Sequence, residues 1–487
     1  MPSFLPLALP PGFARNNTEY QSKGRWHTGD LVRWYGAQLG PIPGSRSRSD
    51  SAVTGKCRRM RVWTDNTATR WIGLATEQQF AVQNSAGDLF DITPADLTAG
   101  NADATAATGY GAGPYGSYAY GVPRPDTGTL TPATVCSVEP WGQYALFVSP
   151  ADGRLFQWQL DTGTKAAVVA GAPTSLTGVV VAGQRFVMTY AGRTVTWCDQ
   201  GDITTWSAAA TNQAGDQDLE TSGQIVTGVR LGPQVLFLTD VDAHAANYLG
   251  PPFIWGFDKV GHGCGAISAG CAASSGAQVA WWGRNQFWIY DGAVRPLPCD
   301  VWDDLQADLN PSQHSKISAY HNAQNGEFWW FYPSTMATEN DSYVFWSYRG
   351  GYWAMGRMAR TAAAEAPTFN FPLAVGTDGL VYEHEVAGLE WADSPYADMI
   401  VELGDGDRVM KVSAIVGDEK TVGQCTVSGG TRLYPGADEA AIAETTLTSA
   451  LTPLRFSGRQ ARLRFAFTDA AARLGAPRLV VQAGGRR

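Results

Sequence analysis

The sequence predicts a nearly all-β protein, and three features of its composition indicate this class. Aromatic residues are abundant, with 18 Trp, 18 Tyr and 19 Phe among 487 residues, and they favour the half-buried, pleated surface of a sheet. The chain also contains 55 Gly and 27 Pro, which shorten helices and mark turns. Hydrophobic residues make up 44% and charged residues 17%, so there is enough apolar material for a folded core.

The length of the chain predicts two or three domains, because a single ordinary core stops growing well below 487 residues. Residues 1–60 show few periodic runs and many Pro, Gly and Arg residues. They predict an extended N-terminal arm, ordered against another molecule or along the rest of its own chain. Residues 61–395 and 396–487 differ in their strand patterns, so we expect one domain in each range.

Short strand candidates separated by turn signals recur through residues 61–395. Three of them share one local pattern, in which a Gly-Asp or Asp-Gly turn leads directly into an apolar-aromatic strand, at 87–90, 152–156 and 378–382. We interpret these as one supersecondary unit used repeatedly. About 335 residues, at about 40–50 per four-stranded blade, predict an irregular β-propeller of six or seven blades. The other strand candidates are residues 70–75, 79–82, 144–148, 185–188, 194–197, 235–238, 286–290 and 327–332.

The C-terminal 90 residues or so alternate between polar and apolar positions. In the segment 458–467, Arg462 and Arg464 fall on one side of a strand while Leu463, Phe465 and Phe467 fall on the other. Such alternation is typical of an antiparallel sheet with one buried face. The range 396–487 therefore predicts a small antiparallel β-sandwich.

Two other kinds of segment interrupt the strand pattern. Residues 301–309 place apolar side chains at helical spacing and stop before Pro311, which predicts a short helix. Residues 362–366 are rich in Ala but too short to form a helix alone. The Gly- and Tyr-rich segment 105–121 is too long for a simple hairpin loop, and its composition suits an adaptable surface that contacts a neighbour.

Charge and cysteine content narrow the functional classes. The net charge of −9 argues against a protein that grips the nucleic-acid backbone, because that grip depends on Lys and Arg. Seven scattered cysteines without a CxxC pair predict buried free thiols in a reducing compartment.

The N-terminus does not resemble a signal peptide. No apolar run reaches 18 residues, so we expect no transmembrane helix or stable membrane insertion.

Glu383 and Glu385 are the strongest candidates for catalysis. Hydrolysis of a glycosidic bond needs two flanking carboxylates, and alternation along a strand would place these two on the same face. A solvated strand face is the interpretation that we favour.

The remaining candidates have simpler explanations. Asp240, Asp242 and His244 predict a loop, since no second ligand cluster accompanies them. Asp303 and Asp304 fall on the predicted helix. The segment 404–407 lacks the bidentate Glu of a Ca²⁺ loop and predicts a turn. Residues 149–156 faintly resemble the structural Asp-box turn of sialidases, and His262 and Cys264 form no dyad that the sequence supports. We therefore predict no catalytic, cofactor-binding or metal-binding residues, no cofactor and no enzymatic activity.

Several segments together resemble one family: the tail hub, nozzle or packaged-DNA stabilisation proteins of short-tailed bacteriophages and related prophages. Residues 197–206 are similar to the W-S-D-x-x-D-x-x-x-W segment of that family, with Cys198 in place of its usual Ser. The other segments that carry the resemblance are 208–216, 20–26, 31–34, 250–253, 321–324 and 327–333.

The resemblance implies a structural virion protein that is assembled in the bacterial cytoplasm and located in the tail. It implies a ring of about six copies, a homohexamer, that closes the head-exit channel and guides DNA during ejection. The implied partners are other copies of the chain, the portal and adaptor proteins, and tail fibres or a tail needle. Genomic DNA would pass through the lumen without sequence-specific binding, and an acidic lumen would let it slide.

Other classes of function remain open at this stage. One is a propeller-type polysaccharide hydrolase, which predicts turnover of host capsule or lipopolysaccharide that is lost when Glu383 or Glu385 is changed. A tail-associated receptor-binding protein is another. A third is a single-copy propeller scaffold that binds peptides, which predicts a monomer in native mass spectrometry.

Overall fold

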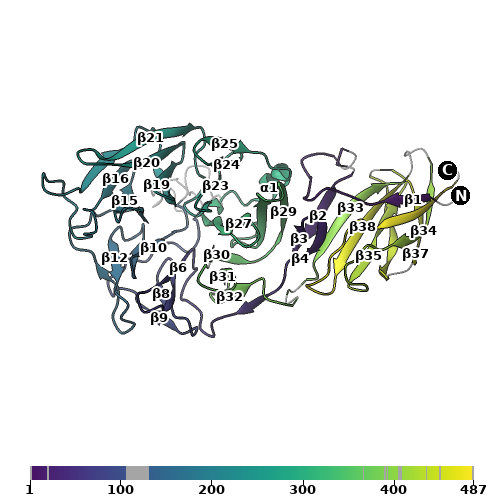
Figure 1. The fold of residues 1–487 in the computed structure, drawn as a ribbon, viewed down its shortest axis with the longest axis horizontal. Helices are drawn as coiled ribbons and strands as arrows, with labels where there is room; N and C mark the ends of the chain where they lie inside the picture. Colours follow the sequence, from purple (N-terminus) through teal and green to yellow (C-terminus); the bar gives the residue numbers. More distant parts are fainter. Residues whose placement is uncertain are drawn as a thin grey trace, which may run out of the picture.

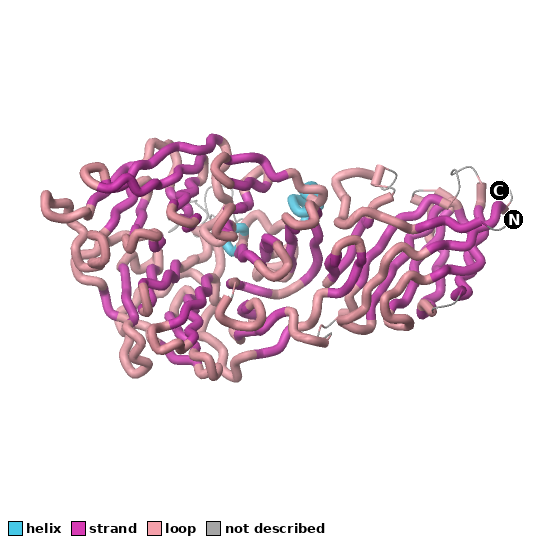
Figure 2. Tube along the Cα trace, in the orientation of Figure 1, coloured by secondary structure: helices cyan, strands magenta, loops and turns pink. Residues whose placement is uncertain are grey.

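The computed structural model describes residues 3–18, 21–22, 24–105, 131–365, 367–388, 391, 393–403, 408–434, 436–448 and 451–484. The described strands form two parts, a propeller and a sandwich, that lie side by side in an elongated molecule (Figure 1). Both chain ends lie at the far end of the sandwich. Figure 2 shows that strands and loops account for almost all of the described chain. Helical structure within these ranges is limited to α1 (Trp302–Asp308) and the 3-10 turn η1 (His314–Lys316).

The propeller consists, within the described residues, of seven four-stranded antiparallel sheets, so the predicted propeller is confirmed with seven blades. Blade 1 consists of β6 (Arg59–Thr64), β7 (Arg70–Ala75), β8 (Phe80–Gln83) and β9 (Leu89–Asp91), and blade 2 of β10 (Ser137–Trp141), β11 (Tyr144–Val148), β12 (Leu155–Trp158) and β13 (Ala167–Val168). Blade 3 consists of β14 (Gly178–Val181), β15 (Val187–Ala191), β16 (Thr194–Trp197) and β17 (Gly215–Asp218), and blade 4 of β18 (Ile225–Leu231), β19 (Gln234–Thr239), β20 (Asp242–Gly250) and β21 (Ile254–His262). Blade 5 consists of β22 (Ala272–Ser274), β23 (Val279–Trp282), β24 (Phe287–Tyr290) and β25 (Val294–Leu297), and blade 6 of β26 (Ser318–Asn322), β27 (Glu327–Tyr332), β28 (Ser342–Ser347) and β29 (Tyr352–Arg357). Blade 7 consists of β30 (Arg360–Ala364), β31 (Leu373–Gly376), β32 (Val381–His384) and β5 (Ser45–Ser47).

The ring of blades closes at blade 7. The first strand of each blade lies nearest the axis and contacts the first strand of the next blade, and β30 of blade 7 meets β6 of blade 1. The outermost strand of blade 7 is β5, with Ser45 opposite His384 and Ser47 opposite Tyr382. A strand from the start of the chain therefore completes the last blade, which leaves only short protected edges around the ring.

The sandwich is built from two antiparallel sheets, as the sequence predicts. One sheet has the order β1 (Ser3–Pro6), β39 (Arg478–Ala483), β34 (Met410–Val416) and β37 (Leu451–Gly458). The other has the order β2 (Trp26–Asp30), β33 (Tyr396–Glu402), β38 (Gln460–Phe467), β35 (Cys425–Arg432) and β36 (Ala440–Thr446). Leu463, Phe465 and Phe467 are buried, while Arg462 and Arg464 on the opposite face of β38 form ion pairs with Asp398.

The N-terminal segment is ordered along its own chain, which is one of the two outcomes expected of an arm. It supplies β1 and β2 to the sandwich, then the hairpin of β3 (Val32–Tyr35) and β4 (Gln38–Pro41), and finally β5 to blade 7. The range 1–60 therefore contributes strands to both parts of the molecule. The largest hydrophobic cluster likewise runs from blades 4 to 6 into the sandwich and includes Trp34, Trp329 and Phe465.

The three predicted Asp-Gly or Gly-Asp turns all exist but do not all occupy one place in a blade. Gly87, Gly153 and Gly379 each have a positive φ of 101°, 77° and 82°, which glycine adopts without steric cost. The turns at Gly153 and Gly379 join the second and third strands of their blades, whereas the turn at Gly87 joins the third and fourth. The interpretation of all three as one repeated unit is therefore wrong for residues 87–90.

The predicted helix at residues 301–309 is confirmed as α1, with Leu305 facing the core. The Ala-rich residues 362–364 lie in strand β30. Small side chains suit this position because the first strands of neighbouring blades crowd together near the axis. The Gly- and Tyr-rich segment 105–121 lies outside the described residues except for Thr105. None of the helices in the described ranges has the length and apolar character that a membrane span requires.

All seven cysteines are free thiols, as the sequence predicts. Six are buried and Cys299 is partly exposed. Burial raises the pKa of Cys57 and of Cys136 to about 12, so their reactive thiolate form is scarce at neutral pH.

We therefore expect the folded protein to react slowly with Ellman's reagent at pH 8, and the protein unfolded in guanidinium to release seven thiols. The reason is that attack needs both an accessible sulfur and a thiolate. Time-resolved absorbance measures the reaction rate of the folded protein and the number of thiols that react in the unfolded protein. Rapid reaction of several thiols in the folded protein would contradict the described burial.

Candidate functional site

The mouth of the propeller channel is a pocket of about 310 Å³. It is lined by the first strands of blades 1, 2, 4, 5, 6 and 7 and by the loop that follows β30. We use the name channel mouth for the pocket defined by Arg61, Glu139, Arg230, Ser274, His321 and Glu365, together with the alanines of β22, β26 and β30. This volume is at the low end of pockets that hold small ligands.

An ion pair lies on one side of the channel mouth. The guanidinium of Arg61 donates from Nε and Nη2 to Oε1 of Glu139, at 3.2 and 2.9 Å. Arg61 is about one-third exposed and Glu139 less so, so this pair is only partly desolvated. Arg230 on β18 is exposed and donates from Nε to the carbonyl of Gly232.

A histidine on the other side of the channel mouth is held at both ring nitrogens. Nδ1 of His321 lies 2.9 Å from Oε2 of Glu365, and Nε2 lies 3.1 Å from the hydroxyl of Tyr348. His321 is buried, whereas Glu365 is about one-third exposed. Because both ring nitrogens have partners in the protein, the orientation of the His321 ring is fixed.

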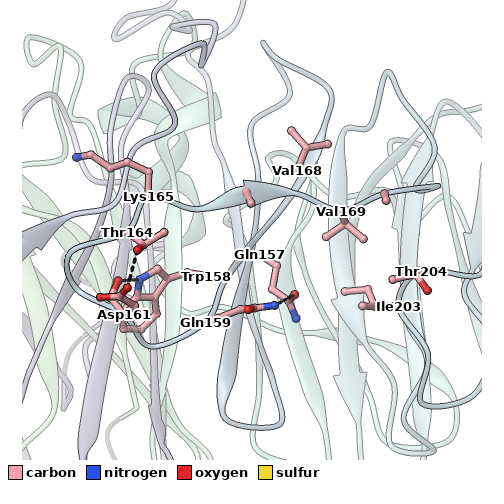
Figure 3. A pocket seen from close by; sticks show the side chains of 12 residues that line it. Gln157, Trp158, Gln159, Asp161, Thr164, Lys165, Val168, Val169, Ile203 and Thr204 are labelled. Atoms are coloured by element: carbon pink, nitrogen blue, oxygen red, sulfur yellow. Dashed lines mark hydrogen bonds between the residues drawn. The ribbon is translucent and has the colours of Figure 1, made fainter.

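A second depression, the rim groove, lies at the outer edge of blades 2 and 3 (Figure 3). Its volume is about 380 Å³, and Gln157, Val168, Val169 and Ile203 are among its lining residues. Asp161 at one end accepts a hydrogen bond from the hydroxyl of Thr164 at 2.5 Å (Figure 3). This bond and the N–H of Gly163 hold the pKa of Asp161 below its usual range, so its carboxyl does not act as a proton donor at neutral pH.

The residues Glu383 and Glu385 do not lie on one solvated face, and that interpretation is wrong. β32 ends at His384, and Glu385 follows with a φ of +60° that breaks the strand alternation. Glu383 is buried and pairs with Arg46 and Arg48 at 2.6 and 2.9 Å. The two carboxylates therefore have separate arginine partners.

Glu385 belongs to a buried ion cluster that we name the joint, formed by Arg33, Glu327, Glu385, Asn322 and Asn325. Arg33 on β3 donates to Glu327 at 2.6 and 2.8 Å and to Glu385 at 2.7 and 2.9 Å. Asn322 and Asn325 each donate to Glu385 at 2.7 Å. The side chains of Arg33 and Glu327 are 3% and 1% exposed, so the cluster is almost fully desolvated.

The charges of the joint decide the protonation of its two carboxyls. Burial raises the pKa of Glu385, but the charge of Arg33 and the hydrogen bonds outweigh it, so the net shift is downward. Burial raises the pKa of Glu327, although Arg33 opposes that shift. The acid of a glycosidase needs a raised pKa and access to substrate. Glu385 has a lowered pKa, and Glu327 is enclosed between Arg33 and Trp329.

The hairpin β3–β4 supplies Arg33 to the joint and also contacts the sandwich. Leu39 forms an isolated bridge with Leu474, through hydrogen bonds of 2.9 and 2.8 Å. The guanidinium of Arg473 lies 3.5 Å from the ring centroid of Tyr35, a cation–π contact. The hairpin therefore connects the propeller, through Arg33, to the sandwich.

The Asp240, Asp242 and His244 segment is a turn followed by a buried strand, which corrects the expected loop. Asp240 lies in the turn, and β20 begins at Asp242. Oδ1 of Asp242 lies 3.1 Å from Nε2 of His244, and Oδ2 lies 3.0 Å from Nζ of Lys259. Among the described residues no group of three or more His, Cys, Asp or Glu side chains is placed to hold a metal ion.

The other sequence candidates occupy structural positions. Asp303 and Asp304 lie in the first turn of α1, where Asp304 pairs with Arg15. His262 is exposed at the end of β21, whereas Cys264 is buried. The segment 404–407 lies outside the described residues.

The Asp-box-like segment 149–156 folds as a structural turn. The N–H of Gly153 donates to the carbonyl of Ser149 at 2.8 Å, and Asp152 pairs with Arg154 at 2.6 Å. Asp152 also accepts the N–H of Thr98 at 2.9 Å. The hydrogen bond with Thr98 connects the turn to the segment that links blade 1 with blade 2.

Comparisons with known proteins return structural similarity alone. No protein-family model matches the chain. No curated protein sequence matches it either. Solved structures similar to this chain include a streptogramin B lyase, with 8% identity over 70% of this chain and 96% of that chain and a TM-score of 0.41. The virginiamycin B lyase from Staphylococcus aureus has 8% identity over 70% and 98%, with a TM-score of 0.41. The WD40 domain of Pan2 from Neurospora crassa has 7% identity over 70% and 93%, with a TM-score of 0.39.

No local sequence pattern predicts the joint as a site. Its contribution to the stability of the protein can be tested by substitution. Replacing Arg33 with Met leaves Glu327 and Glu385 buried without their cation. We expect the free energy of unfolding, measured by urea titration with fluorescence detection, to fall by about 3–5 kcal/mol.

The matched control is Arg46→Met, because Arg46 is exposed and its partner Glu383 keeps Arg48. We expect the control to cost less than about 1 kcal/mol. Equal, small losses for both variants would show that the joint contributes little to stability.

Proposed function

We propose that this chain is a structural virion protein that forms a ring in the tail of a short-tailed bacteriophage. On this proposal the ring closes the exit channel of the head and guides DNA during ejection. Its partners are neighbouring copies of the chain, portal or adaptor proteins, and tail fibres or a tail needle. The protein is assembled in the bacterial cytoplasm and remains in the tail of the virion.

The observation that carries the proposal is where the family-like segments meet. Arg33 comes from the segment 31–34, Asn322 from 321–324 and Glu327 from 327–333. These three residues, far apart in the sequence, belong to the joint. Arg33 donates to Glu327 at 2.6 Å, and Arg33 and Asn322 both donate to Glu385, which lies outside those segments, at 2.9 and 2.7 Å. Three of the seven segments that carry the resemblance therefore meet at a buried connection between propeller and sandwich, which supports a mechanical role for those three.

The segment 197–206 also has a structural role. Trp206 donates from its indole nitrogen to the carbonyl of Ile203 at 2.6 Å, and Asp202 accepts the N–H of Thr204 at 2.9 Å. Cys198, which replaces the usual Ser, accepts the N–H of Val187 at 3.2 Å through its sulfur. The thiol therefore takes a hydrogen bond inside blade 3, and the turn forms without a serine hydroxyl.

A closed head-to-tail ring requires two different contact surfaces on each copy. One candidate is the tip of the β20–β21 hairpin in blade 4, where Leu249 and Phe253 are 60% and 76% exposed. A second lies on the sandwich, where Tyr434 and Leu451 are 55% and 56% exposed. Figure 1 shows blade 4 and the sandwich on different sides of the molecule. This separation supports heterologous contacts, in which the hairpin tip of one copy meets a second copy.

The net charge of −9 fits a ring whose lumen lets DNA slide. Binding to the phosphate backbone depends on Lys and Arg that displace counterions, and an acidic wall lacks that interaction. We therefore expect an acidic lumen in the assembled ring. A strongly basic lumen in an imaged ring would refute this part of the proposal.

Native mass spectrometry of the purified chain tests the assembly. We expect a closed species of about six copies, alone or with portal and adaptor proteins. The double variant Leu249→Ser and Phe253→Ser should lose that species, because it removes the apolar tip of the hairpin.

Met336→Ser is the matched control, since Met336 is 94% exposed but lies in blade 6, away from the tip. It should assemble as the unchanged chain does. A chain that stays monomeric at every concentration and with every added tail protein would contradict the proposal.

A further inference from the structure

One face of the sandwich is apolar although it points away from the core. The sheet β1–β39–β34–β37 carries rows of directly opposed residues, and opposed residues share a face. Two rows on the same face consist of Pro6, Arg478, Val416 and Leu451, and of Phe4, Val480, Ala414 and Pro453. We name the side of the sheet that carries these two rows the outer face.

The row between them shows that the other side of the sheet faces the core. Leu479 and Ile415 oppose each other in that row and are fully buried in the largest hydrophobic cluster. On the outer face, by contrast, Phe4 is 61% and Leu451 56% exposed. The solvent side of an antiparallel sheet normally carries polar residues. Exposed apolar side chains that gather on one face indicate an interaction surface.

The charged residues of this sheet are all basic. Its four strands contain Lys411, Arg455 and Arg478, which are exposed, and no Asp or Glu. Lys411 opposes Gln482, and alternation along β39 and β37 puts Lys411 and Arg455 on the outer face with Arg478. None of the three forms an ion pair with a described residue. In a chain whose net charge is −9, this face is basic and attracts an acidic surface.

A pocket of about 550 Å³ lies in the outer face. Phe4, Pro6 and Val416 supply apolar lining, and Asp418 and Arg478 are its charged residues. Asp418 already accepts the N–H of Ala476 at 2.7 Å. An apolar pocket on an exposed face suits a projecting apolar side chain of a partner.

The β20–β21 hairpin of blade 4 presents side chains of that kind. The rings of Tyr248 and Trp255 lie 5.6 and 5.5 Å from the ring of Phe186 in blade 3, so the hairpin is braced against its neighbour. Beyond these contacts, Leu249 and Phe253 at the tip are 60% and 76% exposed. A braced tip loses little conformational freedom when it binds.

The blades that carry the hairpin are acidic. Residues 178–262, which make up blades 3 and 4, contain eight acidic and four basic side chains, histidines left out. Asp216 on β17 and Asp258 on β21 are exposed, and neither forms an ion pair with a described residue. An apolar tip with unpaired acids nearby therefore complements an apolar pocket with unpaired bases nearby.

We propose that the outer face of one copy receives the blade 4 hairpin tip of the next copy. In this contact Leu249 and Phe253 enter the pocket beside Phe4, and the basic residues of the outer face meet the acidic residues of blades 3 and 4. The two surfaces lie at opposite ends of the molecule (Figure 1), so the contact is head-to-tail. It rests on the proposed ring and names the two surfaces that join neighbouring copies.

Cysteine cross-linking between two differently marked copies tests the contact. One full-length chain carries Phe253→Cys and the other Leu451→Cys, both with Cys299→Ser to remove the partly exposed native thiol. We expect a short bismaleimide to join the two chains in a mixture and to give little product with either chain alone, because the two surfaces differ. In the control, Met336→Cys takes the place of Phe253→Cys. Met336 is 94% exposed but lies in blade 6, so the control should not link.

Native mass spectrometry of the same mixture separates this contact from the ring itself. A closed species that forms without the expected link would overturn the contact and leave the ring in place. A chain that forms neither the link nor any closed species would overturn both.

Neutralising the basic residues gives a second measurement. The triple variant Lys411→Ser, Arg455→Ser and Arg478→Ser should weaken self-association about tenfold in sedimentation velocity, because three exposed ion pairs each contribute a little. Added salt should weaken self-association of the unmodified chain in the same direction. Arg295→Ser is the control, since Arg295 is exposed on β25 of blade 5.

Two results of this second measurement would contradict the proposal. One is self-association that the triple variant leaves unchanged. The other is binding of the unmodified chain to phosphatidylglycerol vesicles that the triple variant loses, together with no cross-link, because the outer face would then bind an anionic lipid surface and not a second copy.

Discussion

The guanidinium of Arg33 is the interaction on which the shape of this molecule depends. It binds Glu327 of blade 6 and Glu385 after blade 7, and almost no part of it reaches solvent. Desolvating one cation and two carboxylates is costly, so the cluster is stable only while all of its members remain in place. Because Arg33 lies on the hairpin that also contacts Leu474 of the sandwich, its geometry fixes the propeller against the sandwich.

The path of the chain strengthens this connection. Before residue 50 the backbone passes through both sheets of the sandwich, the hairpin and the outer edge of blade 7. The sandwich lacks β1 and β2, and blade 7 lacks β5, unless this segment is in place. The apolar core follows the same route, from the aromatic residues of blade 6 through Trp34 to Phe465. An elongated body held by strands, core and buried charges suits a component that transmits force, which is the role that the proposed tail ring requires.

Much of the fold was predictable because the middle strands of the blades are fully buried and strongly apolar. The run 327–332 has an aromatic residue at nearly every position, and all six residues of β27 are buried. Some first strands were harder to predict, because β22 consists of Ala-Ala-Ser and gives little hydrophobic signal. The joint was beyond sequence reasoning: Arg33 is 294 residues from Glu327 and 352 from Glu385, and no local pattern joins them. Strand alternation predicts that Glu385 shares a face with Glu383, but the positive φ of Glu385 breaks that alternation.

Differential scanning calorimetry of the intact chain tests most directly whether propeller and sandwich are one mechanical unit. If the joint and the shared N-terminal strands couple them, both parts unfold in a single transition whose calorimetric and van't Hoff enthalpies agree. Two resolved transitions in the unmodified protein would contradict the account, because they would show that each part unfolds without the other.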